Sequence, residues 1–280
     1  VGDNCGGTVT VFNFPQDAIS NQSCTNRLTI TRSYFAMDEC GNSNNCIQTI
    51  TVNDQTKPTM TCPINVTVSC ANQVPAANTA SVTGVGDNCG GTVTVTNFPS
   101  DAISNQTCAN RFNIMRSYFA VDVCGNSNNC TQIITVNDQT PPNLTCPGAQ
   151  TVACAEQVPA PNPASITGLS DNCGGTATPS FFSDGISNQT CANRFILTRQ
   201  YRATDVCGNT RSCTQVITVN DQTSPVFNSV PANVTVDCYL IPQVGTPTAS
   251  DNCTSGATVS FLGEVSVPGI CPVFKILTRT

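Results

Sequence analysis

One stretch of about 25 residues occurs three times in this chain, and this repetition limits the folds that the chain can adopt. The copies lie at residues 34–58, 118–142 and 201–225. Each copy has the pattern of a strand, a turn between two cysteines, a second strand and an exit that contains proline. A chain that repeats a unit in this way is expected to be an array of similar domains, and its function is expected to belong to the array.

The spacing of a second motif gives the length of the repeat. Asp-Asn-Cys begins at Asp3, Asp87, Asp171 and Asp251, at intervals of about 84 and finally about 80 residues, which is the length of a small domain. The segments Asn-Asp-Gln-Thr-x-Pro mark the boundaries, because proline has a fixed φ and no N–H to donate. Division at these segments predicts four repeats, of which the first and last are partial: 1–53, 54–137, 138–220 and 221–280.

The composition favours an oxidised β-protein. The 280 residues include 19 cysteines and no histidine, and only 10% are charged, which is typical of extracellular, disulfide-containing chains. In the second repeat, runs rich in Thr, Val and Ile predict strands over 65–69, 80–85, 92–97, 111–121 and 131–137, with a short strand near 59–61. The expected fold class is all-β, with tandem immunoglobulin-like sandwiches stapled by disulfides and arranged head to tail. Apolar side chains on both faces of 111–121 predict a central strand.

Several function classes conflict with these residues. The net charge of −6 argues against nucleic acid as a partner, and no apolar run is long enough to insert into a membrane. The absence of histidine excludes Ser-His-Asp and Cys-His nucleophile pairs, so we do not expect an enzyme. The expected location is extracellular, at the cell surface or in a secreted fibre, and the secretion and anchoring signals are expected to lie outside this segment.

Three motifs keep their order within each repeat and carry a family resemblance. In the second repeat they are Pro-x-x-x-Cys-Pro (Pro58, Cys62, Pro63), Asp-Asn-Cys (Asp87, Asn88, Cys89) and Ala-x-Asp-x-x-Gly-Asn-x-x-x-Cys (Ala120, Asp122, Gly125, Asn126, Cys130). This order resembles the hyalin-repeat (HYR)-like family along the whole chain. The resemblance implies extracellular immunoglobulin-like modules of adhesion and surface proteins, including long adhesins of gliding bacteria. It implies no particular ligand.

The six cysteines of a complete repeat allow 15 pairings, and their positions suggest one of them. Cys108 and Cys124 flank one long strand, Cys62 and Cys130 stand at the opening and closing strands, and Cys70 and Cys89 bracket the second strand. The same scheme in every repeat predicts these bonds: Cys24–Cys40, Cys62–Cys130, Cys70–Cys89, Cys108–Cys124, Cys146–Cys213, Cys154–Cys173, Cys191–Cys207 and Cys238–Cys253. Cys5, Cys46 and Cys271 are left over, and a local Cys124–Cys130 loop is the competing scheme.

Most of the acidic residues also recur in each repeat, and two interpretations stay open. One is structural, with Asx-turns and ion pairs such as Arg116 with Asp122 on one strand face. The other is calcium bound where repeats meet, with Asp138 of the linker and Asp87 or Asp122 as ligands. The candidate calcium ligands are Asp87, Asp122, Asp138, Asp171, Asp205 and Asp221. No other cofactor is expected.

Two functions are therefore expected, and they differ in what the surface does. The first is a structural rod or fibre of tandem repeats, whose partners are neighbouring copies or flanking repeats joined head to tail. The alternative is an adhesin whose repeats bind a surface glycan or a protein receptor. The recurring tyrosines Tyr34, Tyr118 and Tyr201 could bind sugars, but tyrosines on strands of a Trp-free sandwich are expected in the core. The partial repeats at both ends predict that the segment is a window on a longer array.

Overall fold

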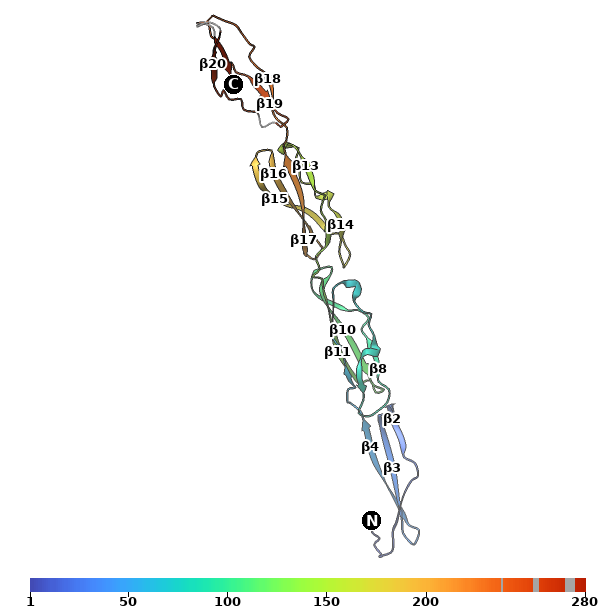
Figure 1. The fold of residues 1–280 in the computed structure, drawn as a ribbon. Coiled ribbons are helices and arrows are strands. Elements are labelled where there is room, and N and C mark those ends of the chain that lie inside the picture. Colours follow the sequence, from blue (N-terminus) through green and yellow to red (C-terminus); the bar gives the residue numbers. More distant parts are fainter. Residues whose placement is uncertain (238, 254–256, 270–274) are drawn as a thin grey trace. The chain divides into compact units, whose positions relative to one another are not determined.

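The computed structural model describes residues 1–237, 239–253, 257–269 and 275–280. Every regular element of these residues is a β-strand or a single turn of 3-10 helix. The chain divides into two compact units, Val1–Gln139 and Thr140–Thr280. The all-β class that the sequence predicted is confirmed, and the strands of each repeat lie side by side in Figure 1.

The first repeat consists of one antiparallel sheet. Strand β3 pairs with β1, β2 and β4, and its long ladder with β4 runs from Arg27 opposite Asn53 to Met37 opposite Ser43. The bounds are β1 Thr10–Asn13, β2 Ala18–Cys24, β3 Arg27–Met37 and β4 Ser43–Asn53. Nearly all its side chains are half-buried or exposed, so this segment has no closed core among its own strands.

The second repeat has a five-stranded sheet and a short antiparallel pair of strands. The larger sheet has the order β6-β11-β10-β8, with β9 also on β10, and β5 pairs with β7. The bounds are β5 Thr59–Thr61, β6 Val66–Val68, η1 Ala71–Gln73, η2 Thr79–Ser81, β7 Thr83–Gly86, β8 Thr94–Asn97, β9 Ala102–Cys108, β10 Arg111–Val121 and β11 Ser127–Asn137. The segment expected as a strand over 80–85 is thus divided between η2 and β7.

Strand β10 occupies the centre of this sheet, as its sequence predicted. Alternate residues of the strand are buried, and Phe112 and Ile114 form a core cluster with Ile134 and Val136 of β11. Tyr118 is buried in the same row, which confirms the core position expected for it. The opposite face is only partly covered, since Met115 is 44% exposed. Burial on one face and partial exposure on the other is the ordinary pattern of an antiparallel sheet.

The third repeat has the same architecture. Its larger sheet has the order β13-β17-β16-β15, and β12 pairs with β14. The core cluster is Phe195, Leu197, Ile217 and Val219. The bounds are β12 Asn143–Thr145, β13 Gln150–Val152, η3 Ala155–Gln157, η4 Pro163–Ser165, β14 Thr167–Ser170, β15 Thr178–Cys191, β16 Arg194–Thr204 and β17 Thr210–Asn220. Equivalent residues thus build equivalent cores.

The fourth repeat contributes two short antiparallel pairs. Strand β18 pairs with β19, and β20 pairs with β21. The bounds are β18 Val226–Ser229, β19 Thr248–Ser250, β20 Glu264–Pro268 and β21 Lys275–Arg279.

The strand before each long central strand was missed in the sequence analysis. Strands β2 and β9 and the second half of β15 contain Asn21, Asn105 and Asn188, whose φ angles are 51°, 54° and 52°. The register with the central strand shifts at the same places. Asparagine tolerates this left-handed backbone better than most residues, so it permits a bulge. The bulge obscures the alternation that would have revealed the strand.

Candidate functional site at the repeat junctions

Two disulfides staple the sheets of the complete repeats, as the sequence predicted. Cys62 follows β5 and bonds to Cys130 in β11, and Cys146 follows β12 and bonds to Cys213 in β17. The Cα–Cα distance is 5.6 Å in both, within the range for a disulfide. Each bond therefore joins the short strand pair of a repeat to its larger sheet.

A third disulfide joins two repeats, and it corrects the expected pairing. Cys24 bonds to Cys124 of the next repeat, 100 residues away, and not to Cys40. The 11-residue strand β3 lies between Cys24 and Cys40, and at about 3.3 Å per residue it separates them by more than 30 Å. A disulfide needs Cα atoms less than about 7 Å apart. The competing Cys124–Cys130 loop is also absent, since each of these cysteines has another partner.

The same offset by one repeat occurs in the second unit. Cys154 bonds to Cys253, at a sequence separation of 99, and not to Cys173. The expected partner of Cys253, Cys238, lies outside the described residues, as does Cys271. Cys70, Cys108, Cys173 and Cys207 are also disulfide-bonded.

Five cysteines of the described residues are free thiols. The free cysteines among the described residues are Cys5, Cys40, Cys46, Cys89 and Cys191, all of them exposed. Cys5 and Cys46 were already expected to lack partners. The pairs expected for Cys40, Cys89 and Cys191 are wrong, because all three thiols are free. The expected Cys108–Cys124 and Cys191–Cys207 bonds would each have to span a whole strand, β10 or β16. A strand between two cysteines separates them, which is a signal that the sequence already contained.

Polar contacts reinforce the junction that Cys24 and Cys124 close. The Arg27 guanidinium donates to the main-chain oxygen of Asp54 at 2.6 Å and to that of Cys124 at 3.2 Å. Arg111 and Arg194 donate in the same way to the main-chain oxygens of Asp138 and Asp221, both at 2.6 Å. An arginine at the start of each central strand thus holds the linker that follows its own repeat. A charged donor makes such bonds stronger than neutral ones.

The turn that carries Cys124 is fixed by Asp122. Its Oδ1 accepts from the main-chain N–H groups of Cys124 and Asn126, and its Oδ2 accepts from the Asn126 side chain at 2.8 Å. Asp205 has the equivalent bonds to Cys207 and Asn209. These two carboxylates are therefore occupied by turn hydrogen bonds, which is the structural interpretation of the recurring aspartates.

Acid should loosen these turns. Burial of the Asp122 carboxyl acts to raise its pKa, but hydrogen bonds from Asn126, Cys124 and Gly125 outweigh burial and hold the pKa below the usual 3.8. A depressed pKa in the folded state stabilises the fold above the unfolded-state pKa, and this contribution is lost as pH falls through the folded-state pKa. We expect the melting temperature to fall below about pH 4, and Asp122→Asn to make that fall smaller. An unchanged pH dependence in this variant, measured from pH 6 to pH 2, would contradict the assignment.

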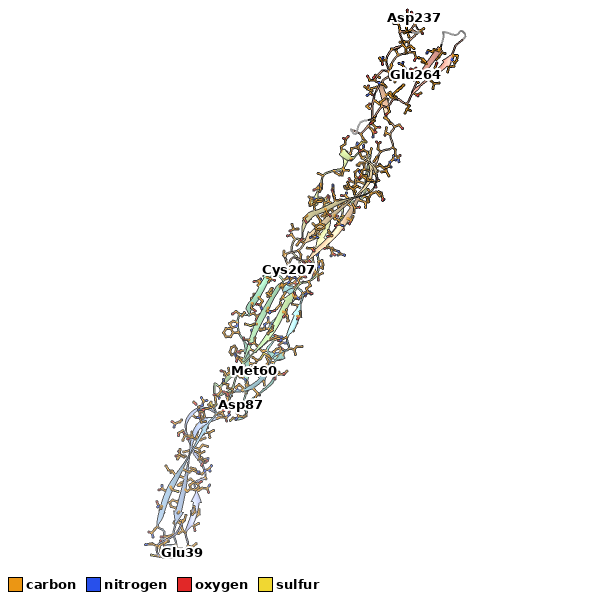
Figure 2. The ribbon with its side chains drawn as sticks, turned by 90° about the vertical axis from the view of Figure 1, so that its left-hand side faces the viewer. Glu39, Met60, Asp87, Cys207, Asp237 and Glu264 are labelled. Atoms are coloured by element: carbon orange, nitrogen blue, oxygen red, sulfur yellow. A yellow bond between two sulfur atoms is a disulfide. The ribbon has the colours of Figure 1, made fainter. Side chains whose placement is uncertain are left out.

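A second set of aspartates meets at the start of the repeats. Asp54, Asp87 and Cys89 place side-chain ligand atoms within 4.8 Å of one another, and so do Asp221, Asp251 and Cys253. Asp87 is labelled in Figure 2, close to the end of the first repeat. Partial desolvation and the negative charges of Asp54 and Asp87 raise the pKa of the Cys89 thiol, which makes it a weak nucleophile. Asp138 and Asp171 hold the equivalent sequence positions.

This grouping differs from the one that the sequence suggested. Asp87 was expected to meet Asp138 of the following linker or Asp122, and it lies instead with Asp54, the linker aspartate at the start of its own repeat. The pairing of two strands explains the difference. The antiparallel pair of β5 with β7 brings residue 86 opposite residue 59, so the residues just before β5 and just after β7 become neighbours. Asp54 was not among the candidate ligands.

Another aspartate in each of the first three repeats forms an ion pair with an arginine of the central strand. Arg116 forms a bidentate pair with Asp101, at 2.9 and 2.7 Å, and not with Asp122. Arg199 pairs with Asp184 and Arg32 with Asp17 in the same manner. Asp101 directly precedes strand β9, which sequence reasoning missed, so the partner of Arg116 could not be identified from β10 alone.

The described residues include no helix long and apolar enough to cross a membrane.

Among solved structures, the protocadherin gammaB7 EC3-6 cis-dimer is 12% identical, with 88% of this chain and 77% of that chain covered and a TM-score of 0.30. The protocadherin GammaB4 extracellular domain is 14% identical, with 90% and 50% covered and a TM-score of 0.30. Drosophila N-cadherin EC1-4 is 10% identical, with 76% and 67% covered and a TM-score of 0.28.

The family comparison concerns the third repeat. No curated protein matches the chain. A family model described as a HYR-like domain with 4 cysteines matches residues 142–219, which carry the Asp-Asn-Cys motif and the Gly-Asn turn of the repeat. Residues 142–219 are therefore a HYR-like domain, as the resemblance of the repeat motifs predicted.

Proposed function

We propose that this chain is a load-bearing segment of an extracellular rod or fibre, built from four HYR-like repeats over residues 1–53, 54–137, 138–220 and 221–280. The disulfide between Cys24 and Cys124 carries this proposal, because it covalently joins one repeat to the next. The Cys154–Cys253 bond supports it from the second unit. A binding module needs no such bond, whereas a chain under tension gains from one at every junction.

The covalent path explains how tension would pass through a junction. Force applied to the main chain before Cys24 reaches Cys124 through one S–S bond, so the residues between them are not stretched. The linker at Asp54 lies within this protected loop, and Arg27 additionally holds its main-chain oxygen. A junction of this kind yields only when covalent bonds are reduced. We propose that the offset by one repeat applies along the whole array, so that the partners of the chain are flanking repeats of the same kind.

The chemistry of the bonds also supports the proposed location. Structural disulfides persist in oxidising compartments, outside the cytoplasm. Small cores with few large apolar groups depend on such staples. The role is mechanical, with no enzymatic activity, and the location is the cell surface or the extracellular space.

Single-molecule stretching of the disulfide-intact chain tests this function. We expect the Cys24→Ala/Cys124→Ala variant to release about 100 Å more contour length than the wild type. In the wild type, the Cys24–Cys124 bond keeps a segment with a separation of 100 residues from being extended. In the variant, only the Cys62–Cys130 bond remains, and it protects a separation of 68 residues, so the difference between the two segments is extended. Chemical reduction of the wild type should release still more. Equal extension of the wild-type chain with and without reductant would rule out a disulfide-borne load. The Cys40→Ala variant, which removes a free thiol, is the matched control and should behave as wild type.

A further inference from the structure

The pair Asp54 and Asp87 combines a buried carboxylate with a half-buried one. Asp54 is only 5% exposed, and its side chain lies within 4.8 Å of that of Asp87. Two like charges at this separation in a low-dielectric site repel each other strongly. A cation between the two carboxylates, or a proton shared by them, relieves this repulsion.

One oxygen of each carboxylate has a partner, and the other has none. Asp54 Oδ1 accepts from the Thr56 main-chain N–H at 3.0 Å, and Asp87 Oδ2 accepts from that of Cys89 at 2.9 Å. Asp54 Oδ2 and Asp87 Oδ1 are buried without a hydrogen-bond partner among the described residues. A buried acceptor without a partner costs about 1–3 kcal/mol, and more when it is charged. Each carboxylate thus keeps one free oxygen in a shared site.

The nearest guanidinium does not fill this role. Arg27 donates to the main-chain oxygens of Asp54 and Cys124 and to Asn126 Oδ1, and to neither carboxylate. The charge of Arg27 therefore lies on the main-chain side of the linker. Asp54 Oδ2 and Asp87 Oδ1 therefore receive no hydrogen bond from Arg27.

We propose that Asp54 and Asp87 bind a hard divalent cation through these two oxygens. Calcium takes six to eight oxygen ligands and magnesium keeps several waters beside one or two carboxylates, so both match a site with two carboxylates. Water and main-chain oxygens would supply the remaining ligands. The sulfur of Cys89 is not needed, because hard cations prefer oxygen. At the equivalent position, Cys253 is already bonded to Cys154.

A related grouping of two carboxylates recurs inside the second unit, where both aspartates are half-buried. Asp221 Oδ1 accepts from the Thr223 main-chain N–H at 3.0 Å, and Asp251 Oδ1 accepts from that of Cys253 at 3.3 Å. The side chains of Asp221 and Asp251 again lie within 4.8 Å of each other. The cation would connect the linker to the turn after the short strand pair in each repeat. This site does not depend on the load-bearing role, since it needs no disulfide.

Calorimetric titration of the chelator-stripped, disulfide-intact chain tests the proposal. Calcium chloride and magnesium chloride are titrated separately, which distinguishes the two cations. We expect saturable binding of at least one, and we expect Asp54→Asn and Asp87→Asn each to remove about one site per chain. Asp17→Asn is the matched control, because it removes one carboxylate from an exposed ion pair outside the cluster, and it should keep the wild-type stoichiometry.

Two outcomes would overturn the site. One is the absence of saturable uptake of either cation by the wild type. The other is wild-type stoichiometry in both Asp54→Asn and Asp87→Asn. If either variant fails to fold, Asp221→Asn provides the same test in the second unit and should also remove about one site. The stretching experiment on the disulfides does not depend on these results, so the two proposals fail separately.

Discussion

Replacing both Cys62 and Cys130 by alanine is expected to lower the free energy of unfolding by about 4 kcal/mol. The bond closes a loop with a sequence separation of 68, and loop-closure entropy gives about this value for such a length. The bond also links the two sheets of the second repeat, whose core cluster consists of four buried side chains. Chemical denaturation of the full chain, followed by circular dichroism, measures the effect.

The control for this prediction is Cys40→Ala. Cys40 is a free and exposed thiol, and its removal should leave the denaturation midpoint within error of the wild type. The Cys146→Ala/Cys213→Ala variant should repeat the loss in the third repeat, because its loop has nearly the same length. A loss below about 1 kcal/mol in both double variants would show that the staples add little to the packed sheets.

Replacing Asp101 by alanine is expected to cost about 3 kcal/mol, because it leaves a buried guanidinium without its counter-ion. The Arg116 side chain is 6% exposed and that of Asp101 is 30% exposed. After the substitution, Arg116 keeps its bond to the main-chain oxygen of Pro75 and its contact with the Tyr118 side chain, and neither replaces the carboxylate. Asp184→Ala should have a similar effect through Arg199, whose side chain is 4% exposed. Denaturant unfolding of each variant measures the loss.

The same ion pair occurs at the surface of the first repeat and gives a matched control. Arg32 and Asp17 pair at 2.8 Å, but the Arg32 side chain is 39% exposed. Exposed pairs contribute little, because water solvates both charges when the pair is broken. Asp17→Ala should therefore cost much less than Asp101→Ala. Equal losses in the two variants would mean that burial of the arginine does not decide the effect.

Much of the fold could be predicted from the sequence, because its causes are local. The alternation of apolar residues predicted strand Arg111–Val121 with correct bounds and placed it at the centre of the sheet. The recurrence of motifs predicted the repeat, and the positions of Cys62 and Cys130 in the opening and closing strands predicted their bond. Strand β9 escaped because Asn105 breaks its alternation with a bulge.

The candidate site was predicted less well, because it depends on which ends of strands meet. Cys24 and Cys40 are close in sequence and far apart along a strand, whereas Cys24 and Cys124 are far apart in sequence and bonded. Periodicity indicates that equivalent cysteines have equivalent partners. It does not show whether the partner belongs to the same repeat or to the next.

The sequence by itself therefore determined the repeat length, the β class, the central strands and the internal staples, because these follow from patterns within one repeat. Only the tertiary structure decided that disulfides cross from one repeat to the next, and that Asp54 meets Asp87 while Asp101 meets Arg116. The physical reason is that an extended strand carries its two ends more than 30 Å apart. The partners of residues at strand ends are thus set by the packing of strands and repeats against one another, and sequence distance does not record that packing.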